Sequence, residues 1–356
     1  MQERGPRRSA ARTDMRIIVA EARVPFARDG AELHAQALVA QLRGRGHDVE
    51  SVTLPFNGRK TELLEQASAW RMLNLSISNA RPIDVLIATR FPTWFARHPR
   101  KVVWLIHQHR PAYDLYGTPY SDFVDSKDDT ELRQQLAALD SQMFAECERL
   151  FTNARNTADR LHRFNGVTAQ PLYHPPPLAD RLGSGPYGDY ILVVARLEPL
   201  KRVELAIRAM TQVSSPTRLV IVGEGSQRTA LERLAADAGV VDRVTFTGAL
   251  WGEPVADLYA GALGVMYVPF DEDYGYVTLE AFLAARPVIT AIDSGGPLEF
   301  VRDGTNGLVC EPTVAALAVA IERLAADHTL AERLGRAGQS VAQSITWNGV
   351  IEQLLG

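Results

Sequence analysis

The sequence predicts an α/β protein made of two doubly wound, Rossmann-like domains with parallel sheets that face a cleft. Short apolar runs recur along the chain, stretches with helical spacing separate them, and a segment rich in Pro and Gly divides the series into two halves. The 356 residues also exceed what one hydrophobic core of about 250–300 residues accommodates. Two domains are therefore expected.

The first half begins with an apolar run at 15–20, interpreted as a buried strand, and a helix is predicted over 30–46. Further strands are predicted at 48–54, 83–89, 101–107 and 149–153, the last after a helix that starts near residue 128. Closely spaced Pro and Gly then interrupt the pattern. We predict a disordered tail at 1–14, an N-terminal domain at 15–175 and a linker at 176–189.

The second half repeats the same alternation without repeating the sequence. Strands are predicted at 190–196, 218–225, 244–248, 264–270 and 287–290, with helices over 203–210 and 231–238. Strands that alternate with helices indicate a parallel sheet covered on both faces. We place the C-terminal domain at 190–344.

Composition and charge exclude several classes of protein. Hydrophobic residues make up 46% and charged residues 22%, which is ordinary globular usage, and the net charge of −4 argues against a dedicated nucleic-acid binder. Two cysteines cannot form a disulfide framework. No signal peptide or membrane-spanning run is seen, so a cytoplasmic protein is expected. The basic excess of the N-terminal half would suit an anionic membrane surface or acceptor, or simply a solvated face.

Ligands of parallel sheets bind at the carboxyl ends of strands, and several loops there contain unusual residues. After the strand at 190–196, Arg196 and Lys201 stand beside a helix start, where two cations and free N–H groups favour an anion. After the next strand, Gly223 and Gly225 would let a ligand approach the backbone, although the full dinucleotide fingerprint is missing.

The loop at 269–282 is the most informative. Glu272 and Glu280 stand eight residues apart, and a carboxylate suits the paired hydroxyls of a ribose. Between them, a helix start can present backbone N–H groups, from Gly275 through Tyr276, Val277 and Thr278. Asp271 and Asp273 form an Asp-x-Asp string, but we predict no metal site, because the helix start already offers positive potential to a diphosphate.

Two places in the first half are also candidates. The strand at 101–107 ends in His107-Gln108-His109-Arg110, a polar cluster whose spacing does not suit a zinc site. Each histidine could equally be a buried hydrogen-bonding group. Gly30, at the start of the first helix, would let a ligand pack against the backbone.

These motifs resemble the retaining GT-B glycosyltransferases of family four, over nearly the whole chain from residue 15. The segment ARLEPLK resembles the donor diphosphate site of that family, and EDYGYVTLE resembles its Glu-x7-Glu signature. The resemblance implies that Arg196 and Lys201 bind the diphosphate, that Glu272 contacts the transferred sugar, and that Glu280 binds the ribose. The backbone from Gly275 to Thr278 would meet the sugar and phosphates.

In the first half, DGAELHAQALVAQLRGRGHDV resembles the first loop and helix of the family, with Asp29 in place of the first Gly, which leaves Gly30 on the phosphate side. VVWLIH resembles the strand whose terminal His faces the donor sugar, which implies His107 rather than His109. Arg202 stands where the family usually has Gly after the Lys. The resemblance also implies a last helix, at 345–356, that crosses back to the N-terminal domain.

The implied activity is a hexosyltransferase that moves a sugar from a GDP- or UDP-linked donor to a glycan, glycolipid or small-molecule acceptor, without metal or cofactor. A nucleotide-sugar epimerase of the same architecture and a non-catalytic nucleotide-sugar binder are the alternatives. A nicotinamide dehydrogenase is disfavoured, because no GxGxxG follows the first strand. Base, sugar, acceptor and oligomeric state stay open.

Overall fold

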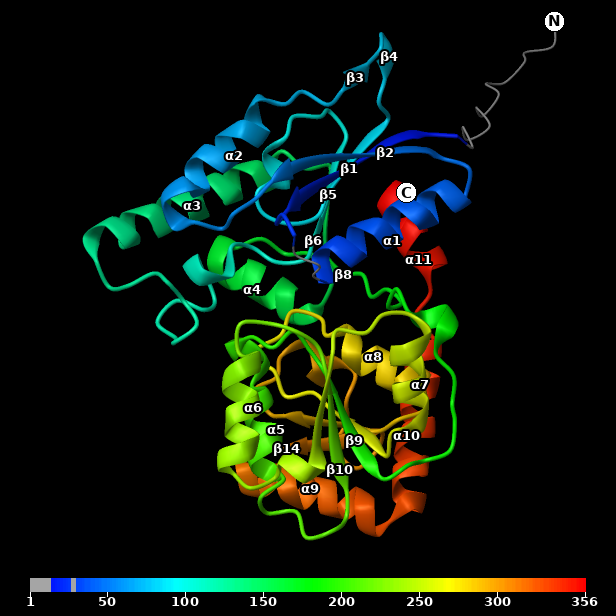
Figure 1. Ribbon diagram of the computed structural model, residues 1–356. Coiled ribbons are helices and arrows are strands. Elements are labelled where there is room, and N and C mark those ends of the chain that lie inside the picture. Colours follow the sequence, from blue (N-terminus) through cyan, green and yellow to red (C-terminus); the bar gives the residue numbers. More distant parts are fainter. Residues whose placement is uncertain (1–13, 27–29) are drawn as a thin grey trace, which may run out of the picture. The chain divides into compact units, whose positions relative to one another are not determined.

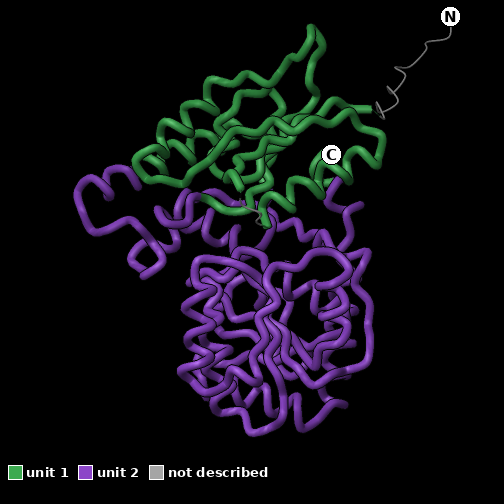
Figure 2. The backbone as a smooth tube through the Cα atoms, viewed as in Figure 1, with its two compact units in different colours: residues 1–108, 135–150, 353–356 green, residues 109–134, 151–352 purple. Residues whose placement is uncertain are grey.

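A computed structural model describes residues 14–26 and 30–356 (Figure 1). All but one residue of the predicted tail at 1–14 therefore lie outside the described residues. The chain forms two compact units (Figure 2): unit 1 comprises 1–108, 135–150 and 353–356, and unit 2 comprises 109–134 and 151–352. Segments 109–134 and 151–175, which we assigned to the N-terminal domain, are grouped with unit 2. The domain boundaries stay a prediction.

The first sheet has six strands in the order β2-β1-β5-β6-β7-β8. The pairs β1–β2, β1–β5, β5–β6 and β7–β8 run parallel, as the alternation of strands and helices predicts. The strands are β1 (Arg16–Arg23), β2 (Asp48–Pro55), β5 (Val85–Ala88), β6 (Lys101–Leu105), β7 (Arg149–Thr152) and β8 (Gln170–Pro171). The helices of this half are α1 (Gly30–Gly44), α2 (Leu63–Met72), α3 (Lys127–Ala145) and α4 (Arg155–Asn165), and a small hairpin joins β3 (Ile77–Ser78) to β4 (Arg81–Pro82).

The second sheet lies entirely in unit 2 and is parallel throughout, in the order β11-β10-β9-β12-β13-β14. Its strands are β9 (Tyr190–Val194), β10 (Arg218–Val222), β11 (Val244–Gly248), β12 (Gly264–Met266), β13 (Val288–Ala291) and β14 (Gly307–Cys310). Its helices are α5 (Val203–Ala209), α6 (Arg228–Asp237), α7 (Glu253–Gly261), α8 (Tyr276–Leu283), α9 (Val314–Ala326) and α10 (His328–Gln343), and α11 (Trp347–Leu355) ends the chain.

This strand order is that of a dinucleotide-binding sheet, in which the direction of winding reverses between the first and fourth strands, here β9 and β12. The loops that leave the carboxyl ends of these two strands consequently border one crevice. Strands β10 and β12 end earlier than predicted, at Val222 and Met266, and the rest of each predicted run belongs to the loop that follows that strand.

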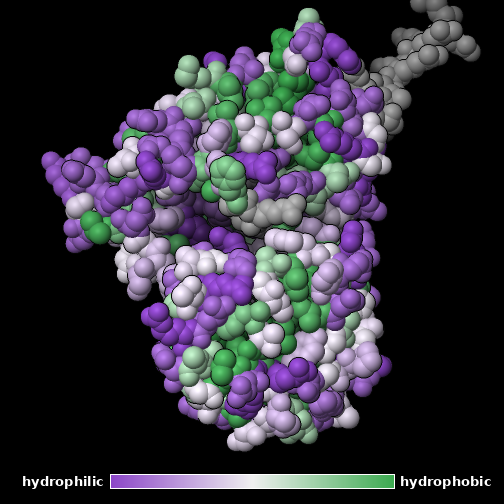
Figure 3. Space-filling model, in the orientation of Figure 1, coloured by the Kyte–Doolittle hydropathy of each residue, from purple (hydrophilic) through white to green (hydrophobic). Residues whose placement is uncertain are grey.

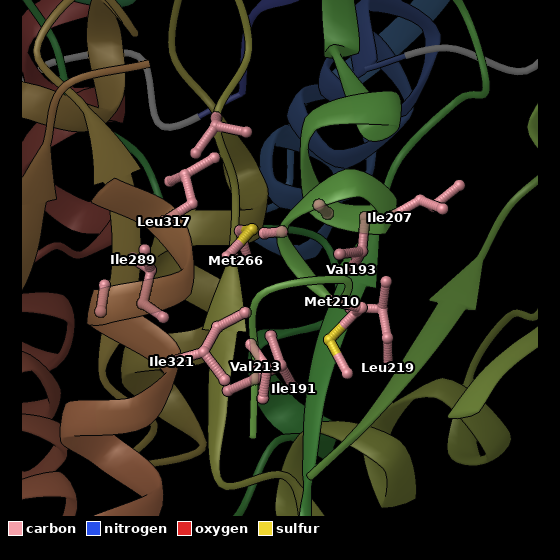
Figure 4. Close-up of a cluster of buried hydrophobic side chains, with 14 of the residues drawn as sticks. Ile191, Val193, Ile207, Met210, Val213, Leu219, Met266, Ile289, Leu317 and Ile321 are labelled. Atoms are coloured by element: carbon pink, nitrogen blue, oxygen red, sulfur yellow. The ribbon is translucent and has the colours of Figure 1, made fainter. Parts of the chain in front are cut away.

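The apolar strand sequences are explained by burial on both faces of the second sheet. Ile191 and Val193 of β9 pack in one core cluster, which Figure 4 shows in part, while Leu192 between them packs in a second. Because side chains alternate across a strand, each face receives every second residue. The two clusters thus pack both faces of the sheet, and the loops leave from its carboxyl edge.

Hydropathy and helix length determine whether a segment can span a membrane. On the face shown in Figure 3, hydrophilic and hydrophobic side chains lie side by side in both units. Among residues 14–26 and 30–356, none of the helices is long and apolar enough to cross a bilayer.

Candidate active site

In unit 2, the loops after β9 and β12 bring three residues into contact. Two of them, Lys201 and Glu272, were predicted as site residues, and the third is Tyr267. Lys201 ends a short 3-10 turn (Pro199–Lys201) after β9, whereas Tyr267 and Glu272 follow β12. The Lys201 ammonium contacts Glu272 Oε2 and lies 3.3 Å from the Tyr267 hydroxyl. That hydroxyl donates to the same carboxylate oxygen at 2.8 Å. The Lys201 and Glu272 side chains are each only 15% exposed, so solvent screens this pair weakly.

These contacts fix the charge of Glu272. Burial, the largest single influence, would raise the pKa of its carboxyl, but the Lys201 ammonium and the Arg110 guanidinium together hold that pKa below its usual value. The pKa of Tyr267 is raised, first by burial and then by the Glu272 charge, so the phenol stays protonated and can donate. Glu272 is thus an ionised carboxylate at neutral pH, held by one cation and one hydroxyl.

Arg196 contrasts with Lys201. Its side chain is exposed, and within the described part of the chain it makes no hydrogen bond or ion pair. It lies close enough to Tyr267 to lower the pKa of that phenol, which places its charge beside the Lys201 cluster. A cation in this position is available to an incoming anion.

Helix α8 begins at the same edge of the sheet. Gly275 precedes it with φ +81°, and a Cβ there would lie 2.9 Å from Tyr267 Cε1 and 3.1 Å from Pro297 Cγ, so only Gly fits. The N–H groups of Tyr276 and Val277 have no partner within the helix, because they belong to its first turn. The Thr278 N–H donates to the Gly275 carbonyl at 3.0 Å, and the Tyr276 hydroxyl lies 2.7 Å from His174 Nε2.

Glu280 stands on α8 in a different environment from Glu272. Its one hydrogen-bond donor from a side chain in the described residues is the neutral Tyr259 hydroxyl, at 2.7 Å from Oε2. Burial raises the pKa of the Glu280 carboxyl to about 7, because this hydroxyl compensates only part of the lost hydration. A carboxylate with so few donors can accept hydrogen bonds from a ligand.

The two loop glycines have a packing reason that sequence reasoning did not find. A Cβ at Gly223 would lie 1.8 Å from the Ala195 carbonyl oxygen, and one at Gly225 would lie 2.5 Å from that of Leu197. The loop after β10 therefore presses its backbone against the loop after β9. Contact of Gly223 and Gly225 with a donor stays a prediction.

A second cluster, missed by sequence reasoning, surrounds the aspartates that flank Glu272. Arg160 of α4 contacts Asp273 and lies 2.9 Å from Asp271 Oδ1, and Arg110 lies 3.5 Å from Asp273. These partners come from more than 100 residues away, so the only sequence signal was Arg110 in the polar cluster after β6. No group of three potential metal-ligating side chains occurs in the described residues.

The remaining predicted residues lie in unit 1. His107 follows β6, is half-buried, and its Nδ1 lies 2.6 Å from the Gln108 carbonyl oxygen. Gly30 is exposed at the start of α1, and Asp29 before it lies outside the described residues. His109, the disfavoured histidine, belongs to unit 2 and is buried with its ring 6.2 Å from that of Phe123.

Arg202 shows how this chain accommodates a residue where the resembled family usually has Gly. Its φ of +49° is in the left-handed region that favours Gly. The guanidinium compensates for this conformation, since it binds both Asp293 oxygens at 2.7 Å and donates to the Val268 and Pro269 carbonyls at 2.8 Å. Arg202 thereby ties the loop after β9 to the start of the loop after β12.

Residues 181–341 match the family described as glycosyl transferases group 1. The D-inositol 3-phosphate glycosyltransferase of Rhodococcus erythropolis is 26% identical over 381 residues, which cover 92% of this chain and 85% of the relative. The enzyme of the same name from Acidothermus cellulolyticus is 32% identical over 244 residues, 61% of this chain and 54% of the relative.

Solved structures agree on the fold. Sucrose-phosphate synthase from Thermosynechococcus elongatus superposes with a TM-score of 0.77 at 18% identity, over 95% of this chain and 97% of that chain. The Anabaena protein Alr3699/HepE, in complex with UDP and glucose, gives 0.70 at 17% identity, over 95% and 98%. The chain thus has a GT-B fold, and its residues 181–341 are similar to the glycosyl transferases group 1.

Proposed function

We propose that the protein transfers a hexose from a nucleoside-diphosphate sugar to a hydroxyl acceptor, with retention of anomeric configuration and without a metal ion. The observation that carries the proposal is the cluster of Lys201, Tyr267 and Glu272 beside the start of α8. It combines a cation, a helix N-terminus and an ionised carboxylate at the crevice where parallel sheets bind ligands.

Each group has a task in this reaction. Breaking the sugar–phosphate bond places negative charge on the diphosphate and positive charge on the sugar, and both need stabilisation. Arg196, Lys201 and the first N–H groups of α8 face the first charge. Glu272 faces the second, and Glu280 accepts hydrogen bonds from the ribose hydroxyls. Contact of His107 with the sugar and of Gly30 with the phosphate side stays a prediction.

The pairing of the loop aspartates supports metal independence. Divalent cations prefer carboxylate oxygens that are free to coordinate. Asp271 and Asp273 instead bind the guanidinium groups of Arg160 and Arg110. The cations that would neutralise a diphosphate are therefore side chains of the protein. The proton of the acceptor would pass to the leaving phosphate on the same face of the sugar.

The comparisons suggest which donor and acceptor to try first. Alr3699/HepE was solved with UDP and with UDP-glucose, so a uridine donor comes before a guanosine one. Several relatives are named for D-inositol 3-phosphate, which makes phosphorylated polyols a reasonable first class of acceptor. Association with an anionic membrane stays a prediction from the basic N-terminal half.

The testing experiment incubates the protein with UDP- and GDP-hexoses and a panel of acceptors, with EDTA or Mg²⁺. We expect transfer at equal rates in both, and a product whose anomeric proton coupling in NMR matches that of the donor. Loss of turnover in EDTA that Mg²⁺ restores, or an inverted product, would contradict the proposal. Conversion of the nucleotide sugar to its epimer without acceptor would favour an epimerase.

A further inference from the structure

The loop that contains Glu272 is held by a helix from a distant part of the sequence. Asn156, in the first turn of α4, donates through Nδ2 to the Glu272 carbonyl at 2.8 Å and to Asp271 Oδ1 at 2.9 Å. A Cβ at Gly295 would lie 2.6 Å from this Nδ2, so the neighbouring loop leaves just enough room for the amide. One side chain thus fixes both the backbone of Glu272 and the residue before it.

Arg160, one turn further along α4, completes the contact. Its side chain is 9% exposed, it contacts the Asp273 carboxylate, and it donates to the Asp271 carbonyl at 2.5 Å. Arg110 supports it from another segment, since it donates to the same carbonyl at 2.6 Å and lies 2.7 Å from Asp114. The two guanidinium groups and three aspartates form a network that is buried except at Asp271, whose side chain is 32% exposed.

Helix α4 is itself anchored, so it can act as a fixed support. The Glu299 carboxylate accepts from the Arg155 and Asn156 N–H groups at 2.9 and 2.8 Å and caps the positive end of the helix. The Tyr173 hydroxyl donates to Glu299 at 2.7 Å. The Glu272 N–H donates to the Ser294 carbonyl at 2.9 Å, which secures the loop from its other side.

The network also sets the charge around Glu272. The groups that face its carboxylate are Lys201, Tyr267, Asp273 and Arg110. Asp273 is a like charge next in sequence, and it raises the pKa of Glu272, whereas Arg110 lowers it. Pairing Asp273 with arginines therefore weakens a repulsion that disfavours the ionised form of Glu272.

We propose that Asn156 and Arg160 are positioning residues for Glu272: α4 fixes the loop and neutralises its flanking aspartates, so that the Glu272 carboxylate meets the donor sugar ionised and in one orientation. This inference rests on the transferase function proposed above. Neither residue needs to touch the substrate. Their effect should therefore appear in turnover and not in the binding of the nucleotide.

The test compares Asn156→Asp and Arg160→Gln with Arg163→Gln as a matched control. Arg163 is an exposed residue on the same helix whose guanidinium stacks on Phe164. Asn156→Asp keeps the shape but replaces a donor with a charge that repels both acceptors. For both test variants we expect kcat to fall at least about tenfold while the Kd for UDP changes less than about twofold, because lost hydrogen bonds to charged groups are large effects.

The pH profile of kcat separates positioning from a general loss of structure. In Arg160→Gln the unneutralised Asp273 should raise the pKa of Glu272, so the acid limb of the profile should move to higher pH. Arg160→Lys keeps the charge but not the forked geometry of the guanidinium. The acid limb of its pH profile should therefore lie at the wild-type pH, whereas its kcat should recover only in part. Arg163→Gln should match the wild type in kcat, in the Kd for UDP and in the pH profile.

Either of two kinetic results would overturn the inference: unchanged kcat in both test variants, or a loss of UDP affinity as large as the loss of kcat. Hydrogen exchange of the peptide 270–275 keeps this test separate from the proposed function. Faster exchange in the test variants than in Arg163→Gln is expected even if no donor is turned over, and unchanged exchange would contradict positioning. A wild type inactive with every nucleotide sugar would count against the proposed function alone.

Discussion

Glu272 and Glu280 belong to one short segment, yet their surroundings are opposite. Glu272 contacts Lys201 and accepts from Tyr267, and its pKa lies below the usual value. Glu280 accepts from the neutral Tyr259 hydroxyl, and its pKa is raised to about 7. Sequence spacing alone would make the two carboxylates equivalent, and tertiary neighbours make them different.

The difference indicates two separate tasks. A carboxylate that is already ionised and held by a cation suits a reaction in which positive charge develops on a sugar. A carboxylate that is short of donors gains most from a ligand that brings hydroxyls. We therefore expect Glu272 to act on turnover and Glu280 to act on donor affinity.

Replacing Glu272 should have the largest effect. Glu272→Gln removes the charge but keeps the size, and we expect kcat to fall by roughly 10²–10³, comparable to loss of one charge-stabilising group. UDP affinity should change little, since Arg196 and Lys201, the proposed partners of the diphosphate, remain. Steady-state kinetics and calorimetry with UDP measure the two quantities, and wild-type turnover in this variant would remove Glu272 from the reaction.

Replacing Glu280 should show the reverse pattern. Glu280→Ala removes an acceptor worth about 1.5–3 kcal/mol to the ribose hydroxyls, so we expect the Kd for uridine and for UDP to rise together by roughly 10–100-fold. Saturating donor should recover most of kcat. A 2′,3′-dideoxy nucleotide is the control, because it lacks the hydroxyls and should bind wild type and variant alike.

Arg196→Ala and Lys201→Ala should weaken the binding of the diphosphate without weakening the binding of the nucleoside. Each contact to a phosphate is worth about 1.5–3 kcal/mol, so UDP affinity should fall while uridine affinity stays the same. Lys201→Ala should also raise the pKa of Glu272, which Arg196→Ala should not. Equal losses for uridine and UDP in calorimetry would contradict the diphosphate assignment.

The smallest effect concerns stability. The folded-state pKa of Glu280, about 7, exceeds its ordinary value of 4.5, so the protonated carboxyl stabilises the fold at low pH and this contribution is lost as pH rises through about 7. Glu280→Gln cannot ionise. We expect its Tm relative to wild type to increase by roughly 2–5 °C between pH 5 and pH 8, measured by calorimetry. A constant difference would argue against the raised pKa.

The sequence predicted most of the strands and the Glu-x7-Glu segment because these signals are local, but it did not predict β8, β14 or the hairpin of β3 and β4. Strands such as β5 and β9 are continuous apolar runs, and Glu272, Gly275 and Glu280 lie within nine residues. The contact between Lys201 and Glu272 follows from the strand order, because β9 and β12 are neighbours in the sheet. The ends of β10 and β12 were placed too late. Apolar residues continue beyond β12, whereas Gly223, Glu224 and Gly225 follow β10.

The supports of the site could not be predicted in the same way. Asn156 and Arg160 meet the Glu272 loop across more than 100 residues, and neither belongs to a motif. Gly223 illustrates the opposite problem: a loop glycine suggests a ligand, but here the close neighbour is the Ala195 carbonyl. A loop glycine in the sequence indicates that some group lies close to the backbone there. It does not indicate whether that group is a ligand or another part of the chain.

The most direct test of the contrast between the two carboxylates is a ¹³C NMR titration of the glutamate side-chain carboxyls in the ligand-free protein, with Glu272→Gln and Glu280→Gln used for assignment. We predict one resonance that titrates near pH 7 and is missing only in Glu280→Gln. We predict a second that titrates below 4.5 and is missing only in Glu272→Gln. Two carboxyls that both titrate near the ordinary value of 4.5 would contradict the division of tasks between Glu272 and Glu280.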